Sequence, residues 1–183
     1  VDSKLAEVLV KPFLECIIAP AFSKKALNIF KKKKNLRIIQ IDSRSNFINE
    51  KSLRSVMGGV IIQDSDIKTI NLNDEGRIVT KKKPDEIELK AMSLGWKIIK
   101  YIKSNAILLC NEQKIIGVGA GQMSRIDSLK IAISKAKENS LNLDGCVMVS
   151  DAFFPFDDCL KLASSVGIKS VIQPGGSIKD DEI

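Results

Sequence analysis

The feature of the sequence that most constrains its fold is a series of short apolar runs that alternate with stretches of helical periodicity. Apolar runs of this length, closed by proline, glycine or charged residues, are typical of strands buried in a sheet. A chain that alternates such strands with helices packs them in layers. We therefore predict an α/β fold with a layered α/β/α arrangement. The expected strands are 14–19, 36–41, 58–64, 105–111, 114–119, 146–150 and 170–173.

The longest helical stretch is 84–103, and it begins with a proline followed by acidic residues and ends with lysines. This charge order stabilises a helix, because the helix dipole is positive at its start and negative at its end. Five apolar side chains recur at spacings of four and three residues, so we expect them to form one buried stripe. They are Ile87, Ala91, Leu94, Ile98 and Tyr101. Further helices are expected at 22–34, about 124–138, and 157–166.

The length of 183 residues suits one domain or two small ones that share a core. The turn-rich segment "NLNDEGR" marks the best boundary between two units. We therefore predict a first α/β unit over 1–78 and a second over 79–183. The polar stretch 42–52 is expected to run over the surface.

The chain contains no histidine, which removes histidine-based nucleophilic catalysis and most catalytic zinc sites. Any general acid or base must be a carboxylate, lysine or tyrosine, or must come from elsewhere. The four cysteines are widely spaced and form no CxxC pair, so we expect reduced core residues. No apolar run approaches 18 residues and no signal peptide is recognisable, so we expect a cytoplasmic protein without a membrane partner.

The net charge of +7 is concentrated in two lysine runs, 31–34 and 81–83. Neither run has aromatic residues interleaved, so each indicates a solvated face or a general anion field rather than a nucleic-acid groove. We expect no nucleic-acid partner. A basic RNA-binding domain is the alternative, and steep salt dependence of RNA affinity would support it.

Three of the expected strands end in segments of unusual chemistry, and ligands of open α/β sheets bind at such strand ends. The first segment is "GVGAGQMSR", in which Gly117, Gly119 and Gly121 allow close backbone approach and Arg125 adds a donor fork. The pattern lacks both the dinucleotide fingerprint and the P-loop lysine. Its two readings are a polar-ligand loop and a simple tight turn.

The second segment, "SDAFFPFDD", places three aromatic rings and Pro155 directly after an apolar strand. We expect Phe154 in the core, with Phe153 and Phe156 on the other side. A ring and a proline beside the Asp151 carboxylate suit a planar heterocycle, whereas the alternative is a buried corner. The third segment, "QPGGS", exposes backbone ahead of a serine and suits phosphate, carboxylate or amide contacts, or is an ordinary glycine turn. A zinc deaminase is excluded, because its HxE and PCxxC motifs are missing.

Read together, these segments strongly resemble the AICAR transformylase part of the bifunctional AICAR transformylase/IMP cyclohydrolase family, in its bacterial form. The resemblance covers nearly the whole chain and rests on long, idiosyncratic blocks. They include "FLECIIAPAFSKKALNIFKKKKNLR", "GGVIIQDSD", "GVGAGQMSRIDS", "SDAFFPFDD" and "VIQPGGSIKDDE".

The resemblance implies a phosphoribosylaminoimidazolecarboxamide formyltransferase, which transfers a formyl group from 10-formyltetrahydrofolate, its co-substrate, to AICAR in purine (IMP) biosynthesis. In the family this activity is joined to IMP cyclohydrolase, a hydrolase, in one multifunctional enzyme. The implied fold resembles cytidine deaminase without the zinc, and no metal is required. The implied partners are AICAR, folate and a second copy of the chain in a homodimer.

The resemblance also implies roles for individual residues, matched by their positions in the motifs. Asn105 matches the catalytic asparagine, which also holds the nucleotide and can donate to a developing oxyanion. Phe153 matches a nucleotide contact. The implied folate contacts are Arg125, Ile126, Pro155, Phe156, Asp158 and Ser177.

The chain also departs from the family, since it looks truncated at both ends. The family's Lys-His pair would lie upstream of residue 1, and the basic C-terminal tail and the cyclohydrolase half are missing. We therefore expect the chain to be inactive alone. The alternative function is a non-catalytic nucleotide- or anion-binding module, which would not discriminate in favour of a pterin.

Overall fold

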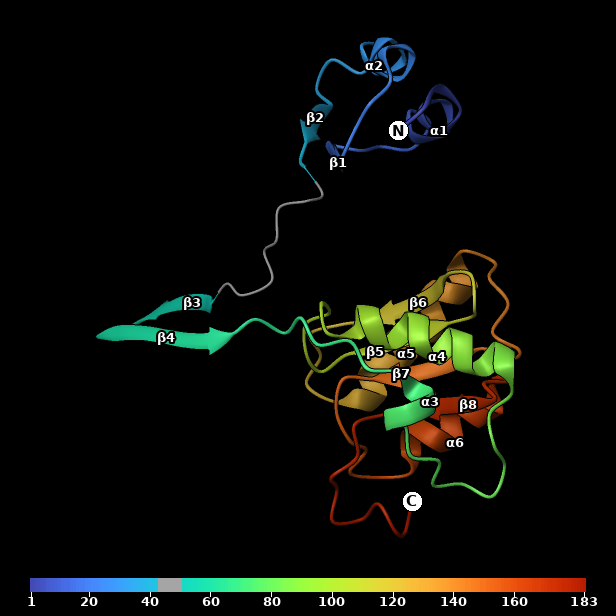
Figure 1. Cartoon of the computed structure of the whole chain (residues 1–183). Coiled ribbons are helices and arrows are strands. Elements are labelled where there is room, and N and C mark those ends of the chain that lie inside the picture. The colour runs from blue at the N-terminus through green and yellow to red at the C-terminus, as the bar shows by residue number, and fades with distance from the viewer. Residues whose placement is uncertain (43–50) are drawn as a thin grey trace. The chain divides into compact units, whose positions relative to one another are not determined.

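The computed structural model describes residues 1–42 and 51–183, which form two compact units, Val1–Ile67 and Lys68–Ile183 (Figure 1). The sequence placed the boundary at 78/79, eleven residues later than this division. The assignment of these parts to a transformylase domain stays a prediction. The polar stretch predicted to run over the surface lies outside the described residues at 43–50.

In the first unit, helices α1 (Ser3–Leu9) and α2 (Lys24–Phe30) pack with the parallel strands β1 (Cys16–Ala19) and β2 (Arg37–Gln40). A small core joins these elements, and its buried members are Ala6, Ile17, Ala26 and Phe30. Ser23 caps α2, because its Oγ accepts a hydrogen bond from the N–H of Ala26 at 3.1 Å.

Strands β3 (Lys51–Val56) and β4 (Gly59–Asp64) form an antiparallel hairpin. The chain reverses at Gly58, whose positive φ of 81° suits glycine. The prediction of a buried strand at 58–64 was right about the strand and wrong about its burial, since every residue of both strands is exposed. A two-stranded ribbon leaves both faces open unless another layer covers it.

The second unit is built on a four-stranded sheet in the order β6-β5-β7-β8. Its strands are β5 (Ile107–Cys110), β6 (Ile115–Gly119), β7 (Val147–Ser150) and β8 (Ser170–Ile172). Strand β5 is antiparallel to both of its neighbours and forms a hairpin with β6, and β7 runs parallel to β8. The helices of this unit are α3 (Leu72–Glu75), α4 (Glu86–Ile99), α5 (Arg125–Glu138) and α6 (Asp158–Ser165).

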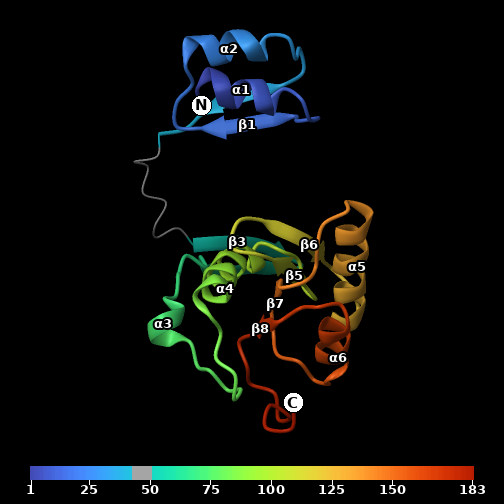
Figure 2. The same ribbon diagram turned by 90° about the vertical axis from the view of Figure 1, so that its right-hand side faces the viewer.

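Helix α4 lies on one face of this sheet, and α5 and α6 lie on the other (Figure 2). Successive strand residues point to opposite faces, so Leu108 and Val149 pack towards α4, whereas Leu109 and Met148 pack towards α5 and α6. The predicted α/β class and its α/β/α layering are therefore confirmed. The likeness to cytidine deaminase stays a prediction.

The face that α4 buries differs from the predicted stripe, because Ile87 is 60% exposed and Tyr101, beyond the end of the helix, is 80% exposed. The cause is Gly95, where an added Cβ would lie 2.5 Å from Cγ2 of Val149. This close approach turns the glycine side of the helix onto the sheet. The residues that α4 buries are Glu88, Ala91, Met92, Gly95 and Ile99.

The four cysteines, all within the described ranges, are free thiols, and only Cys16 is exposed. The prediction of core thiols therefore holds for Cys110, Cys146 and Cys159. Burial raises the pKa of Cys110 and of Cys159 to about 12. Among the described residues, no helix combines the length and apolarity needed to cross a membrane.

Candidate functional site

The strand register brings the predicted binding segments to one edge of the four-stranded sheet. Ile107, at the start of β5, pairs with Gly119 at the end of β6 and with Ser150 at the end of β7. Val149 in turn pairs with Ile172 at the end of β8. The segments 103–106, 120–124, 151–157 and 173–177 therefore leave the sheet at this same edge. We call this the site edge.

Asn105 ties the start of β5 to the loop that precedes α5. Its side-chain amide donates hydrogen bonds to the carbonyls of Gln122 and Met123, at 3.0 and 3.2 Å. Its own carbonyl accepts a hydrogen bond from the buried hydroxyl of Ser128 at 2.7 Å. Both amide hydrogens are thus engaged within the protein. The atom of this amide that remains for a ligand is Oδ1, which is an acceptor.

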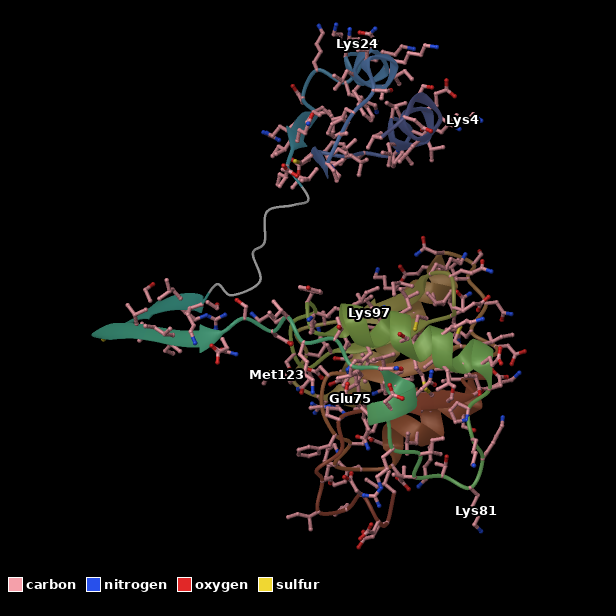
Figure 3. All side chains as sticks on the ribbon, in the orientation of Figure 1. Lys4, Lys24, Glu75, Lys81, Lys97 and Met123 are labelled. Carbon is pink, nitrogen blue, oxygen red and sulfur yellow. The ribbon has the colours of Figure 1, made fainter. Side chains whose placement is uncertain are left out.

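The loop held by Asn105 includes Met123, whose side chain is 96% exposed (Figure 3). After it, Ser124 caps α5 by accepting a hydrogen bond from the N–H of Asp127 at 3.2 Å. The cap begins the helix at Arg125, so the position of Arg125 follows from this loop.

Arg125 and Asp151 form an ion pair that joins α5 to the end of β7. Nη2 of Arg125 lies 3.5 Å from Oδ1 of Asp151, and the two side chains are 15% and 14% exposed. The same carboxylate accepts hydrogen bonds from the N–H of Ala106, at 3.1 Å, and from the hydroxyl of Ser104. The Nε of Arg125 is buried and has no hydrogen-bond partner among the described residues. This N–H is therefore both unpaired and out of reach of solvent in the described structure.

The glycines of the first predicted segment serve a different purpose from the one predicted. Gly117 and Gly119 lie in β6, where an added Cβ would meet the carbonyl oxygens of Ala132 at 2.2 Å and of Ser128 at 1.8 Å. The close backbone approach that they allow is therefore to α5. Gly121 has a positive φ of 67°, and its N–H donates to the carbonyl of Lys103 at 2.7 Å. Of the three glycines, only Gly121 lies in a tight turn, whereas Gly117 and Gly119 belong to the strand.

The aromatic segment divides as predicted. Phe154 is 1% exposed and belongs to the core beneath α5 and α6, whereas Phe153 and Phe156 are 40% and 59% exposed. The N–H of Phe154 donates to Oε1 of Gln173 at 2.8 Å, which links this corner to the end of β8. Pro155 lies half-buried between the two exposed rings in sequence.

The remaining predicted contacts surround this corner. Nζ of Lys179 lies 5.0 Å from the centroid of the Phe156 ring, within cation–π range. The N–H of Ser177 donates to Oδ2 of Asp180 at 3.0 Å, so this backbone donor is already engaged. The side chain of Ile126 packs against the core, which leaves its backbone as the part nearest to any ligand.

Asp158 and Arg125 both affect the pKa of the buried Cys159 thiol. Burial first, and then the Asp158 carboxylate, raise the pKa of Cys159 to about 12, whereas the Arg125 guanidinium acts in the opposite direction. The backbone N–H of Cys159 also donates to Oδ1 of Asp158 at 2.7 Å. The two predicted folate contacts therefore lie around one point of α6.

Sequence reasoning noticed Asp151 but did not place it among the site residues, and it missed Ser104 and Ser128. A carboxylate directly after a buried strand was the available signal for Asp151, since such a group lies at the strand end. Nothing in the pattern of the sequence distinguished the two serines.

Two other features of the described residues bear on the site. No group of three or more histidine, cysteine, aspartate or glutamate side chains there could hold a metal ion. A groove of about 440 Å³ is lined by residues of α4 and of the α3 region, and none of the predicted site residues lines it. Its lining residues are Asn71, Leu72, Asn73, Glu86, Leu89, Lys90 and Ser93.

Comparison with known proteins identifies the family. The family described as AICARFT/IMPCHase bienzyme matches residues 1–135. A bifunctional purine biosynthesis protein from Staphylococcus carnosus is 48% identical over 182 residues, which are 100% of this chain and 36% of the relative. Proteins of the same name from Prochlorococcus marinus and Bacillus cereus are 48% and 46% identical over 183 residues, 100% of this chain and 35% of each relative. The chain thus spans about a third of the length of these relatives. It belongs to the AICARFT/IMPCHase bienzyme family.

Proposed function

We propose that the site edge forms part of a formyl-transfer site in purine biosynthesis, at which 10-formyltetrahydrofolate is the donor and AICAR the acceptor. One observation carries the proposal. Asn105, Arg125 and the exposed rings of Phe153 and Phe156 come from different strand ends and meet at one edge of one sheet. Membership of the family supports a role in purine biosynthesis, since its relatives are named as bifunctional purine biosynthesis proteins.

The chemistry of the residues suits this reaction. Formyl transfer to a weakly nucleophilic aromatic amine depends on holding the two flat reactants in a reactive orientation. The rings of Phe153 and Phe156, with Pro155 between them in sequence, would stack on planar heterocycles. Oδ1 of Asn105 would accept a hydrogen bond from the amine and orient it. The exposed part of the Arg125 guanidinium would donate to a carbonyl of the folate.

A general base for the amine is not among these residues. The chain contains no histidine, and the amide of Asn105 cannot take up a proton. We therefore propose that the 183-residue chain binds the folate but does not transfer the formyl group alone. No metal enters the proposed chemistry. Detectable formyl transfer by the purified chain would contradict this part of the proposal.

We also propose a homodimer and a cytoplasmic location. The hairpin supports the homodimer, because Leu53, Val60 and Ile62 alternate onto one face of it and are 69%, 58% and 63% exposed. A group of large apolar side chains at a surface is typical of a site of protein association. Sedimentation analysis over a range of concentrations tests this, and a chain that stays monomeric at high concentration contradicts it.

The experiment that tests the function is calorimetric titration of 5-formyltetrahydrofolate, a stable analogue of the donor, into the chain with and without AICAR. Binding should be lost in Arg125→Ala and retained in Arg77→Ala. This control removes the same charge from an exposed position of the same unit. Equal binding of the analogue by Arg125→Ala would contradict the proposed site. Binding of simple phosphate with no preference for the pterin would instead favour the anion-binding module.

A further inference from the structure

We propose that Asp151 is a specificity-determining residue at the site edge. It neutralises Arg125, so that Arg125 donates hydrogen bonds to a neutral acceptor and disfavours an anion such as phosphate. The choice of a pterin carbonyl or ring nitrogen as that acceptor rests on the proposed function. The discrimination between neutral and anionic ligands does not.

The Asp151 carboxylate is held in place by its neighbours at the site edge. It accepts hydrogen bonds from the N–H of Ala106 and from the hydroxyl of Ser104, and its own N–H donates to the carbonyl of Ala106 at 3.3 Å. With 14% of its side chain exposed, it has little room to move. A ligand that reaches Arg125 therefore meets this negative charge as a fixed neighbour.

Asp151 engages only part of the Arg125 guanidinium. The contact with Asp151 uses Nη2, at 3.5 Å, while Nε is buried and without a partner among the described residues. A ligand can reach Arg125 only through the 15% of its side chain that is exposed. Arg125 thus offers a hydrogen-bond donor whose positive charge is already paired.

A neutral ligand and an anion would meet different charges at Arg125. An anion at the exposed part of the guanidinium would gain attraction from Arg125 but would lie close to the fixed Asp151 carboxylate, and the repulsion is strong where water is largely excluded. The carboxylate of Asp158, which acts on Cys159 from the same region as Arg125, adds a second negative group. Lys179 lies over the Phe156 ring, with its Nζ 5.0 Å from the ring centroid. A neutral carbonyl or ring nitrogen meets no such repulsion.

The decisive variant is Asp151→Asn in the full chain. Asparagine has nearly the same size and keeps an acceptor for the N–H of Ala106, but it removes the negative charge. With inorganic phosphate as the probe, calorimetric titration should show about tenfold tighter binding to Asp151→Asn than to the wild-type chain. The gain should disappear when Arg125→Ala is added to Asp151→Asn.

Asp144→Asn is the matched control, since it removes the same charge from an exposed residue ahead of β7, at the opposite edge of the sheet. It should leave phosphate affinity within about twofold of the wild-type value. Circular dichroism and thermal unfolding establish that each variant is folded. A purely structural Asp151 would lower the stability of Asp151→Asn without raising its phosphate affinity.

Three results would overturn the proposal. They are a folded Asp151→Asn with unchanged phosphate affinity, a gain that survives Arg125→Ala, and a gain of equal size in Asp144→Asn. If Asp151→Asn does not fold, a comparison of the wild-type chain with the single variant Arg125→Ala still tests the proposal. Both should bind phosphate equally weakly. A loss of tight phosphate binding in Arg125→Ala would refute the proposal. Titration of 6-methylpterin, a small neutral pterin, tests the proposed function separately.

Discussion

Asn105 and Gln122 are joined by two hydrogen bonds to a single atom. The carbonyl oxygen of Gln122 accepts from the backbone N–H of Asn105 at 3.4 Å and from its side-chain amide at 3.0 Å. The same amide also reaches the carbonyl of Met123. The loop between β6 and α5 is therefore held by a residue at the start of β5, and the position of Arg125 depends on Asn105.

Substitution of Asn105 by aspartate tests this dependence. A carboxylate cannot donate to the two carbonyls and would repel both, so the loop should shift and Arg125 with it. We expect a fall of about 1–3 kcal/mol in the free energy of unfolding and a loss of 5-formyltetrahydrofolate binding. Urea unfolding and calorimetry measure the two effects.

Asn139→Asp is the control for this change. The side-chain amide of Asn139 donates to the carbonyl of Lys135 at 2.8 Å in an exposed position at the end of α5. Its replacement should change stability less and leave binding unaltered. If Asn105→Asp binds the analogue as the wild-type chain does, then Asn105 does not position this loop.

Gly119 offers a test of the contact between β6 and α5. An added methyl group would lie 1.8 Å from the carbonyl oxygen of Ser128, and this backbone atom cannot turn aside as a side chain would. Gly119→Ala should therefore separate the strand from the helix and lower the free energy of unfolding by about 3 kcal/mol. Chemical denaturation followed by circular dichroism gives this value.

Gly59→Ala is the matched control, because Gly59 also lies in a strand and an added Cβ there meets nothing within 4 Å. It should change stability by less than about 0.5 kcal/mol. Similar losses in both variants would mean that the cost lies in the strand backbone and not in the contact with α5.

The sequence was sufficient to predict the strands of the second unit. It was also sufficient to predict at which end of the sheet the candidate segments lie. Short apolar runs bounded by turn residues indicated these buried strands, and the core position expected for Phe154 is confirmed. Strict alternation separates Phe154 from Phe153 but not from Phe156, which lies two residues further on. The burial of α4 could not be derived in this way. A glycine in a helix gives no hydrophobic signal, yet Gly95 decides which side meets the sheet.

The candidate site shows a similar division between what motifs can and cannot indicate. The resemblance named Arg125 and Asn105, but the partner of each was not visible in the sequence. Asp151 lies 26 residues from Arg125 along the chain, and the two meet only because β7 pairs with β5. For the hairpin the prediction was wrong. The apolar residues of β4 indicated a buried strand, but every residue of β4 is exposed.

Phe154 and Phe156 should respond in opposite ways to the same substitution. Phe154→Ala removes a fully buried ring and should lower the free energy of unfolding by about 3–5 kcal/mol. Phe156→Ala removes a ring that is 59% exposed and should change stability by less than about 0.5 kcal/mol. Under the proposed function, however, it should weaken binding of 5-formyltetrahydrofolate by about tenfold. Thermal unfolding and calorimetry on both variants separate stability from binding. Full binding by Phe156→Ala would remove this ring from the proposed slot.

The buried thiols predict how the stability of the chain depends on pH in the alkaline range. The pKa of Cys110 and of Cys159 is raised to about 12 in the folded chain, chiefly by burial, from an ordinary value of 9.0. Above pH 9 the unfolded chain therefore loses thiol protons that the folded chain keeps. Stabilisation from these two thiols is complete below pH 9 and is lost as the pH rises from 9 towards 12.

Cys159→Ala provides the comparison that isolates this effect from the titration of lysines. The difference in the free energy of unfolding between the wild-type chain and Cys159→Ala should shrink as the pH rises from about 8 to about 10.5, as urea unfolding can show. Cys16→Ala should show no such trend, because this thiol is exposed. In the folded wild-type chain at pH 8, a thiol reagent should modify Cys16 rapidly and the three buried cysteines only on unfolding. A constant difference across the pH range, or rapid modification of Cys159, would show that the Cys159 thiol is not sequestered in the core of the second unit.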